Sequence, residues 1–211
     1  DLAEAGNGND SEIYTLGGRI AHQFDENWKG RAEFAQQVGK KNGARLCAMG
    51  FNSRLEYFLN DENNNNFRVG YEYLSGDRAG TATNEQFDPL WGRWPQFSEL
   101  YIYPYAGETR IAEVTNLHRI NVGWSTWPTK KTELCLDYHL LLADKNTLSG
   151  SAGFSGSGNV RGHLLGAIMR HKFNKHVSTH LLGEVFFPGD YYDDTRNDVA
   201  MMFRWELMFK L

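Results

Sequence analysis

Residues 199–211 alternate between large apolar side chains and polar or smaller ones. The apolar set occupies every second position: Val199, Met201, Phe203, Trp205, Leu207, Phe209 and Leu211. Successive side chains of a β-strand point to opposite faces, so this segment predicts a strand with one apolar and one charged face. The pattern recurs along the chain. It favours a sheet whose apolar face meets lipid and whose polar face meets water.

Composition excludes several classes of protein. Aromatic residues make up 14% of the chain although its mean hydropathy is only -0.55, a combination that suits a barrel wall. No apolar run approaches the roughly 18 to 20 residues of a membrane-spanning helix. The net charge of -4 and the dispersed Lys and Arg residues argue against a nucleic-acid partner. Cys47 and Cys135 lack the spacing of a disulfide framework or a metal site, and the histidines form no ligand motif, so no metal or cofactor is implied.

Alternation bounded by turn residues predicts about nine strands, whose lengths suit the roughly 9 to 11 residues that cross a bilayer at a tilt. The predicted spans are 12–24, 28–38, 46–59, 67–76, 114–127, 131–143, 160–173, 176–187 and 198–211. The seventh is the least regular, because Leu164, Leu165, Ala167, Ile168 and Met169 are apolar on both faces. The predicted fold class is an all-β antiparallel transmembrane β-barrel.

The connections alternate in length and so predict the topology. Short turns are expected at 25–27, 60–66, 127–130 and 174–175, and longer links at 39–45, 77–113, 144–159 and 188–197. Short turns of bacterial outer-membrane barrels face the periplasm, and long loops face outside. The first and last strands then run in the same direction, whereas a complete single-chain barrel has an even number of antiparallel strands. We therefore expect residues 1–211 to be one barrel segment, the C-terminal part of a larger barrel whose other strands belong to the same gene product or to another chain.

A soluble sandwich or a lipocalin-like barrel also alternates and is an alternative fold. The aromatic residues favour a membrane barrel, since girdles of aromatic side chains mark both membrane interfaces. Candidates at the short-turn end are Phe24, Trp28, Trp124, Trp127, Phe173 and Phe209, and candidates at the other end are Tyr71, Tyr73 and Phe187. The expected location is the bacterial outer membrane.

Three segments together resemble the alginate-export family of outer-membrane porins. They are the strand end Tyr71 to Asp77, the Phe87-Asp88-Pro89-Leu90 turn within 85–93, and Asn116-Leu117. The likeness is to the C-terminal half of that barrel, and the rest of the chain matches only in hairpin rhythm. The resemblance implies a wide monomeric barrel of about twice as many strands, with an arginine-rich lumen through which a polyuronate leaves the cell. Because the family is broad, the resemblance supports a porin better than it supports alginate as the solute.

The long aromatic loop at about 77–113, expected to be extracellular, is a candidate lid or constriction. Pro89 and Pro95 restrict its backbone, and its aromatic rings offer surfaces that pack over a pore mouth or stack on sugar rings. The candidate solute-contacting aromatics are Phe87, Trp91, Trp94 and Tyr101, accompanied by Phe97, Tyr103 and Tyr105. The alternative is a private core within the loop. Ser98 to Tyr105 is also compatible with an additional short strand.

The polar faces of the predicted strands supply the candidate pore-lining residues. The inward cations are Arg19, Lys29, Arg31, Arg54, Arg68, Arg119, Arg170, Lys172, Arg204 and Lys210, and the inward anions are Glu33, Glu56, Glu72, Glu133, Asp137, Glu184 and Glu206. Many of these will pair across neighbouring strands. The excess of cations predicts a modest preference for anions, because guanidinium groups match carboxylates.

The sequence thus predicts a non-enzymatic outer-membrane porin for passive transport or export of anionic or sugar-derived solutes, with membrane lipid, an anionic or carbohydrate solute and further barrel strands as partners. A barrel that is a scaffold or sheath for a partner protein is the alternative. An outer-membrane hydrolase is a remote one. Ser178 and His180 share one strand face and His139 lies on another, but no third group orients them as a catalytic site requires.

Overall fold

The computed structural model describes residues 11–90, 92, 95–109 and 113–210. Trp91, Trp94 and residues 1–10 lie outside this part. The elements in chain order are β1 (Glu12–Gln23), β2 (Trp28–Lys41), β3 (Ala44–Phe58), β4 (Asn66–Leu74), β5 (Thr83–Asn84), α1 (Ile102–Thr109), β6 (Leu117–Thr129), β7 (Thr132–Leu142), β8 (Val160–Lys172), β9 (Val177–Pro188) and β10 (Ala200–Phe209).

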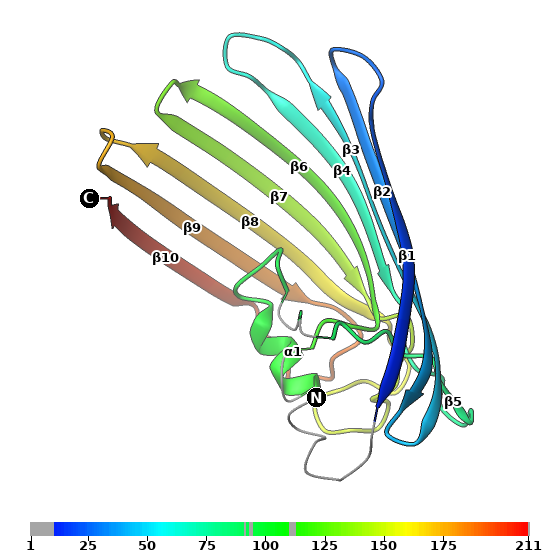
Figure 1. The fold of residues 1–211 in the computed structure, drawn as a ribbon. Helices are drawn as coiled ribbons and strands as arrows, with labels where there is room; N and C mark the ends of the chain where they lie inside the picture. Colours follow the sequence, from blue (N-terminus) through cyan, green and yellow to red (C-terminus); the bar gives the residue numbers. More distant parts are fainter. Residues whose placement is uncertain (1–10, 91, 93–94, 110–112, 211) are drawn as a thin grey trace.

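Nine long strands form one curved antiparallel sheet (Figure 1), as the alternation predicts. Each strand pairs with its neighbour in the order β1-β2-β3-β4-β6-β7-β8-β9-β10. Two-residue β5, which was not predicted, pairs in parallel with β3. β1 and β10 are the two edges of the sheet, run in the same direction and are not paired with each other in the described part of the chain.

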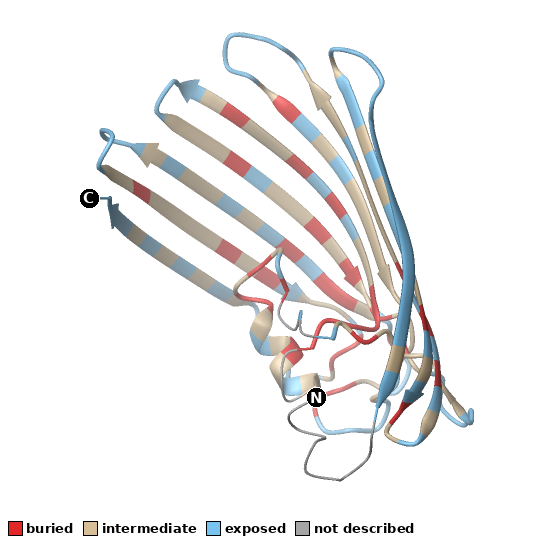
Figure 2. Cartoon of the chain, in the orientation of Figure 1, coloured by how far each residue is buried: buried red, intermediate tan, exposed pale blue. Residues whose placement is uncertain are grey.

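The two faces of the sheet differ as predicted. Outward side chains are large, apolar and exposed: Leu136 is 50% exposed and Trp205 62%. The inward side chains that alternate with them are polar or are covered by the loops. Figure 2 shows the resulting alternation of exposed and buried positions along the strands. An apolar outer surface of this extent is stable in lipid and unfavourable in water, which excludes the soluble sandwich.

One predicted connection is wrong. The link expected at 39–45 is a two-residue turn, because β2 continues to Lys41 and β3 begins at Ala44. Asn42 and Gly43 have φ values of 52° and 80°, both in the left-handed region. Two consecutive residues with positive φ form a type I′ turn, whose twist matches that of the two strands of a hairpin. Asn-Gly is the preferred sequence for this turn. The hairpin is therefore tight although it lies at the end of the sheet that carries the long loops.

The other three links at this end, 75–116, 143–159 and 189–199, gather beneath the sheet together with α1 (Figure 1). The expectation of an extra strand over Ser98 to Tyr105 is wrong, because α1 begins at Ile102. The Ser98 hydroxyl accepts a hydrogen bond from the backbone N–H of Tyr101 at 3.0 Å, and this contact fixes the turn that leads into the helix.

The irregular apolar pattern of β8 has a packing explanation. Leu165 is exposed on the outer face, whereas Leu164 is 1% exposed and belongs to the buried cluster between the sheet and the loops. Leu141 of β7 and Phe186 of β9 belong to the same cluster. The strand is apolar on both sides because one side faces lipid and the other supports the inward-folded loops.

Candidate functional site

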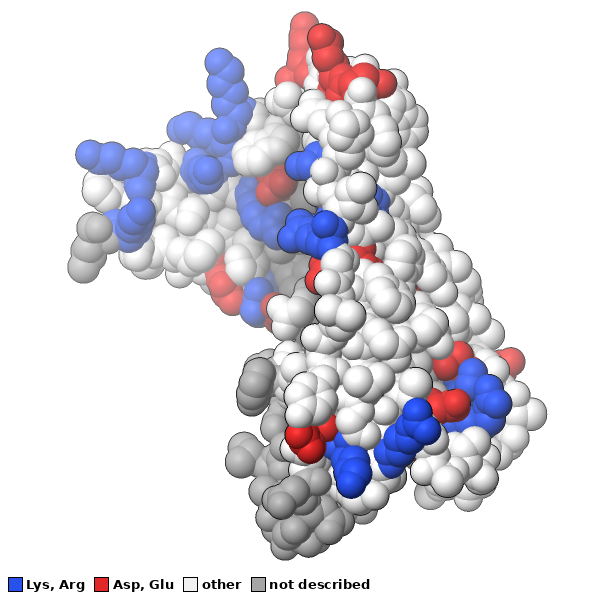
Figure 3. Space-filling view, turned by 45° about the vertical axis from the view of Figure 1, so that its right-hand side comes forward, with Lys and Arg blue, Asp and Glu red and all other residues white. Residues whose placement is uncertain are grey.

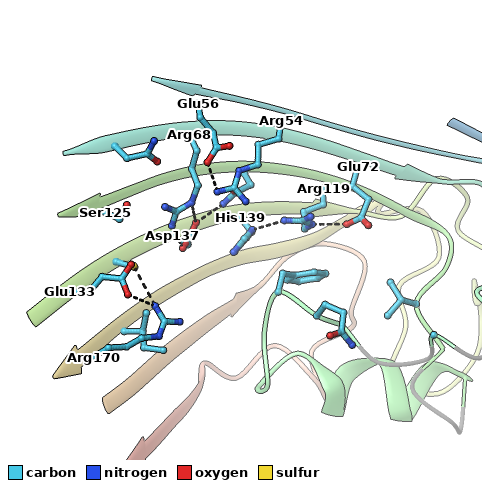
Figure 4. Close-up of a pocket in the computed structure, with 18 of the residues that line it drawn as sticks. Arg54, Glu56, Arg68, Glu72, Arg119, Ser125, Glu133, Asp137, His139 and Arg170 are labelled. Carbon is cyan, nitrogen blue, oxygen red and sulfur yellow. Dashed lines mark hydrogen bonds and ion pairs between the residues drawn. The ribbon is translucent and has the colours of Figure 1, made fainter. Parts of the chain in front are cut away.

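The inner face of the sheet and the loop 75–116 enclose an open cavity of about 1060 Å³. Its wall comes mainly from β3, β4, β6, β7 and β8, and Figure 4 shows its charged side chains directed into one space. The charged residues that line it are Arg54, Glu56, Arg68, Glu72, Arg119, Glu133, Asp137 and Arg170. All eight are among the inward-facing charged residues expected from the sequence.

These eight residues form four ion pairs. Arg54 contacts Glu56 at 2.9 Å, Arg119 contacts Glu72 at 2.7 Å, Arg170 contacts Glu133 at 2.9 Å, and Arg68 contacts Asp137. Glu72 and Arg119 stand directly opposite each other in the β4–β6 register, and Glu133 and Arg170 do so in β7–β8. Cross-strand pairs of opposite charge stabilise a sheet by about 0.2 to 1 kcal/mol each. The cavity wall is therefore charged but locally neutral.

The Arg68–Asp137 pair spans three strands and depends on a glycine between them. Gly123 of β6 lies opposite Arg68 of β4 and opposite Asp137 of β7. A Cβ atom at residue 123 would collide with the guanidinium of Arg68 and the carboxylate of Asp137. Arg68 Nε donates to Asp137 Oδ1 at 3.1 Å, and Asn121 Nδ2 donates to the same oxygen at 3.1 Å. The missing side chain thus makes room for the pair.

His139 and Phe97 extend the site toward the loop. Arg119 Nη1 lies 3.3 Å from His139 Nδ1, and because a guanidinium only donates, this imidazole nitrogen accepts. The Arg119 guanidinium also lies 4.6 Å from the centre of the Phe97 ring, which is 5.3 Å from the imidazole ring. The aromatic loop residue therefore covers the charged wall at Arg119 and His139.

The loop 75–116 is attached to the sheet at several points. Gln37 of β2 exchanges two hydrogen bonds with the backbone of Asp88, at 2.7 and 2.8 Å, and the Asp88 carboxylate contacts Lys41 at 2.9 Å. Glu184 of β9 accepts hydrogen bonds from the backbone N–H groups of Glu99 and Leu100 at 3.0 and 2.7 Å. Two different parts of the sheet thus hold the loop inward, over the cavity.

Helix α1 is fixed by a buried arginine that the alternation did not identify. Arg161 has no exposed side-chain surface, binds both carboxylate oxygens of Glu108 and lies 4.9 and 4.6 Å from the ring centres of Tyr105 and Tyr191. Burial raises the pKa of Tyr105 well above its usual value even though the Arg161 cation opposes this effect. The Tyr105 hydroxyl therefore stays protonated and donates to the backbone oxygen of Thr115 at 3.2 Å.

A β-bulge explains why Arg161 was missed. Strict alternation places Arg161 on the outer face, but in the β7–β8 register Leu141 pairs with Gly162 and Leu142 with Val160. Arg161 is the extra residue between them, and a bulge redirects the side chain it carries. The adjoining Gly162 has φ 144°, a conformation that favours glycine. In the sequence, the one trace of this bulge is the glycine that follows Arg161 near the start of the strand, and strict alternation takes no account of it.

The candidate loop aromatics have different environments. Tyr101 is fully buried and packs edge-on against Tyr105 and Phe186, at ring-centre distances of 5.2 and 5.0 Å. Phe87 is half-buried and lines the cavity, and Tyr103 is 72% exposed. Trp91 and Trp94 lie outside the described residues. The described aromatics combine a private core with a few rings that face the cavity.

The remaining candidate pore residues lie apart from the four central pairs. Arg19 faces Glu33 across the exposed β1–β2 pair, and Arg31 faces Arg54 across β2–β3. On β10, Arg204 contacts Glu206 at 3.0 Å and Glu99 of the loop at 2.7 Å. Glu184 points inward, as expected, and its carboxylate is occupied by the loop backbone. The candidates therefore form a central group, an edge group and a loop-anchoring group.

Among the described residues, no group of three or more His, Cys, Asp or Glu side chains is placed to hold a metal ion. His180 Nε2 lies 2.8 Å from Arg204 Nη2, and no hydrogen bond joins His180 to Ser178 among the described residues. No helix in the described ranges is long and apolar enough to span a membrane.

A curved antiparallel sheet with an apolar outer surface and charged pairs inside is the wall of an outer-membrane porin. A family model described as alginate export matches residues 2–205. The chain belongs to the alginate export family of outer-membrane porins, and its location is the bacterial outer membrane. A solved structure titled "NanC porin structure in rhombohedral crystal form" aligns with a TM-score of 0.49 and 10% identity, over 94% of this chain and 79% of that chain. No curated protein matches the sequence.

Proposed function

We propose that this porin is a passive channel for anionic or sugar-derived solutes, without enzymatic activity of its own. The observation that carries the proposal is the set of four arginine–carboxylate pairs lining a cavity of about 1060 Å³. Each guanidinium has five N–H donors, and a single pair uses only one or two of them. Donors therefore remain for solute carboxylates, and the paired carboxylates accept from solute hydroxyls.

The loop 75–116 narrows this channel in our proposal, with the loop end of the sheet outside the cell and the short turns in the periplasm. A second cavity of about 800 Å³ lies between the loop and strands β7 to β10, and Phe97 and Tyr103 line it. A sugar presents apolar C–H faces as well as hydroxyls, so an aromatic ring beside an arginine suits it. This arrangement favours a hydroxylated, acidic solute over a simple inorganic anion.

Further antiparallel strands complete the wall in this proposal. β1 and β10 are long edges whose outer backbone groups have no strand partner among the described residues, and lipid cannot satisfy such groups. Since both run in the same direction, an antiparallel closure requires an odd number of additional strands. Two copies related by an axis along the membrane normal would place β1 beside β10 in parallel, so strands from another part of the gene product or from a different chain fit better.

Single-channel recording tests the proposal. The purified full-length protein, reconstituted in planar bilayers, should form open channels, and liposomes that contain it should admit neutral and acidic monosaccharides. Absence of conductance together with a protein bound in the lumen would support the sheath alternative. Hydrolysis of model esters or peptides by the purified protein would support the hydrolase.

A further inference from the structure

The four short turns at one end of the sheet divide by charge. The turns β1–β2 and β3–β4 carry only acidic charged residues, and the turns β6–β7 and β8–β9 carry only basic ones. The acidic set is Asp25, Glu26, Asp61 and Glu62; the basic set, which we call the lysine arc, is Lys130, Lys131 and Lys175 together with Lys172 and Lys210 at the adjoining strand ends. Figure 3 shows acidic and basic side chains gathered on separate parts of the molecule's upper region.

The acidic turns have a local structural explanation. Asp25 accepts hydrogen bonds from the backbone N–H groups of Asn27 and Trp28 at 2.8 and 2.7 Å, and Asp61 accepts one from the N–H of Asn65 at 2.8 Å. Aspartate side chains commonly form turns in this way. These carboxylates therefore shape the hairpins that carry them.

The lysine arc has no such explanation. All five lysines are exposed, and none forms an ion pair within the described part of the chain. Lys131 donates to the backbone oxygen of Phe173 at 3.2 Å, but backbone turns here are made by other groups, such as Asn174. Clustering like charges without partners is unfavourable by itself, so the arc indicates an anionic ligand.

The arc borders the lumen rather than the lipid. Lys172 follows Arg170 by two residues on the inward face of β8, and Lys210 continues the inward series of Arg204 and Glu206 on β10. The exposed aromatic rings Phe173 and Phe209 occupy the adjacent outward positions, where lipid lies. Neighbouring hairpins lie roughly 10 Å apart, since strands are spaced by about 4.8 Å. That distance is close to the Debye length of about 8 Å at physiological salt, so adjacent turns act together on a mobile anion.

We propose that the lysine arc is a capture site for a carboxylated oligosaccharide chain at the short-turn mouth of the channel. The inference rests on the proposed function and deepens it, because it assigns the mouth at which the chain is taken up. The oligosaccharide binds at the short-turn ends of β6 to β10 and passes from Lys172 to Arg170 at the wall of the large cavity. The acidic turns on the other half of the mouth repel it, so the chain enters along one side of the lumen.

One-sided block of single channels tests this site. Oligogalacturonate added to the bilayer chamber that faces the short turns should interrupt the current of the full-length protein, and its fully methyl-esterified counterpart should not. The variant Lys130→Gln/Lys131→Gln/Lys172→Gln/Lys175→Gln should weaken the block at least about tenfold, since several exposed ion pairs are lost together. The control variant Lys40→Gln/Arg78→Gln removes two cations at the loop end and should leave the block unchanged.

Other outcomes overturn the inference. An unchanged block in the lysine variant, or equal weakening in the loop-end variant, would show that the arc is not the capture site. Loss of binding to phosphatidylglycerol vesicles without loss of oligogalacturonate block would assign the arc to lipid. Fluorescence polarisation of labelled oligogalacturonate with the detergent-solubilised protein measures capture without conductance. A silent channel that still binds through the arc would contradict the proposed function and leave the capture site standing.

Discussion

At the scale of single residues, a buried arginine decides how the loop helix is held. Arg161 binds Glu108, donates to the backbone oxygen of Asn116 at 3.1 Å and lies between the rings of Tyr105 and Tyr191. It thereby joins β8, α1, the start of β6 and the loop after β9. Removing one partner of a buried pair leaves an uncompensated charge, which costs more than the pair itself contributes.

The variant Arg161→Met should destabilise the protein by about 3 to 5 kcal/mol, because Glu108 is left charged and buried. The double variant Arg161→Met/Glu108→Gln should recover part of this loss, since no unpaired charge remains. Urea unfolding of the protein in lipid vesicles measures both. If the double variant is no more stable than the single one, the cost comes from lost packing against the tyrosine rings rather than from charge.

Leu136, in contrast, contributes through its contact with lipid. An arginine at the bilayer midplane destabilises an outer-membrane barrel by about 2 to 4 kcal/mol, and the cost falls to roughly 0 to 1 near the interfaces. Leu136→Arg should therefore destabilise the protein strongly, and Phe209→Arg at the strand end only slightly, in the same unfolding measurement. Equal costs would show that Leu136 is not at mid-membrane. Asp137→Asn is unsuitable as a neutral control, because it removes the partner of Arg68.

At the scale of elements, regular alternation was enough to predict the nine long strands, because each residue's face is determined by its neighbours. Three features break this local rule. Asn42-Gly43 is a clear sequence signal for a two-residue turn, but the prediction relied on strand alternation and missed it. Helix α1 and the Arg161 bulge depend on contacts with distant residues, such as Glu184 and Glu108, which periodicity does not reveal. The same holds for the pairing of lumen charges, since Arg68 reaches Asp137 only across Gly123.

The two longest loops are joined at their bases by Asp144. Its carboxylate accepts from the backbone N–H of Gly76 at 2.9 Å and from Lys145 Nζ at 2.9 Å, and it lies 3.3 Å from His118 Nε2. Burial by itself raises the pKa of Asp144, but the hydrogen bonds from Gly76, Lys145 and His118 outweigh burial and hold the pKa below its usual value. The folded state therefore favours the ionised carboxylate.

Because the pKa of Asp144 is lower in the folded state, the protein becomes less stable as the pH falls. The stabilisation from Asp144 is fully present above the unfolded pKa of about 3.9 and is lost as pH falls through the lower folded value. Below about pH 4, amide hydrogen exchange in 75–90 and 143–159 should accelerate. Asp144→Asn should produce this faster exchange already at neutral pH, whereas Asp198→Asn, an exposed control, should not. Identical exchange in Asp144→Asn and the parent protein would exclude a joining role.

At the scale of the whole molecule, the sheet separates three environments: lipid outside, a charged but paired wall inside, and a layer of loops across one end. The excess of inward cations expected from the sequence is absent from the four pairs of the central cavity, where four arginines meet four carboxylates. Selectivity then depends on which member of each pair extends further into the solute path. Arg170 is 51% exposed and Glu133 22%, whereas Arg68 is 10% exposed and Asp137 28%. The balance differs from pair to pair, so the net preference of the pore should be modest.

Two opposite sets of substitutions measure that preference. Neutralising Arg54, Arg68 and Arg119 to Gln should lower the anion-to-cation permeability ratio, because Glu56, Glu72 and Asp137 are left charged beside the solute path. The reciprocal variant Glu56→Gln/Glu72→Gln/Asp137→Asn should raise it, and the two reversal potentials under a salt gradient should shift in opposite directions. Both shifts should shrink at about 1 M salt, where the Debye length is roughly 3 Å. If neither variant moves the reversal potential, the pairs serve only to hold the wall together, and the loop that covers them sets the selectivity.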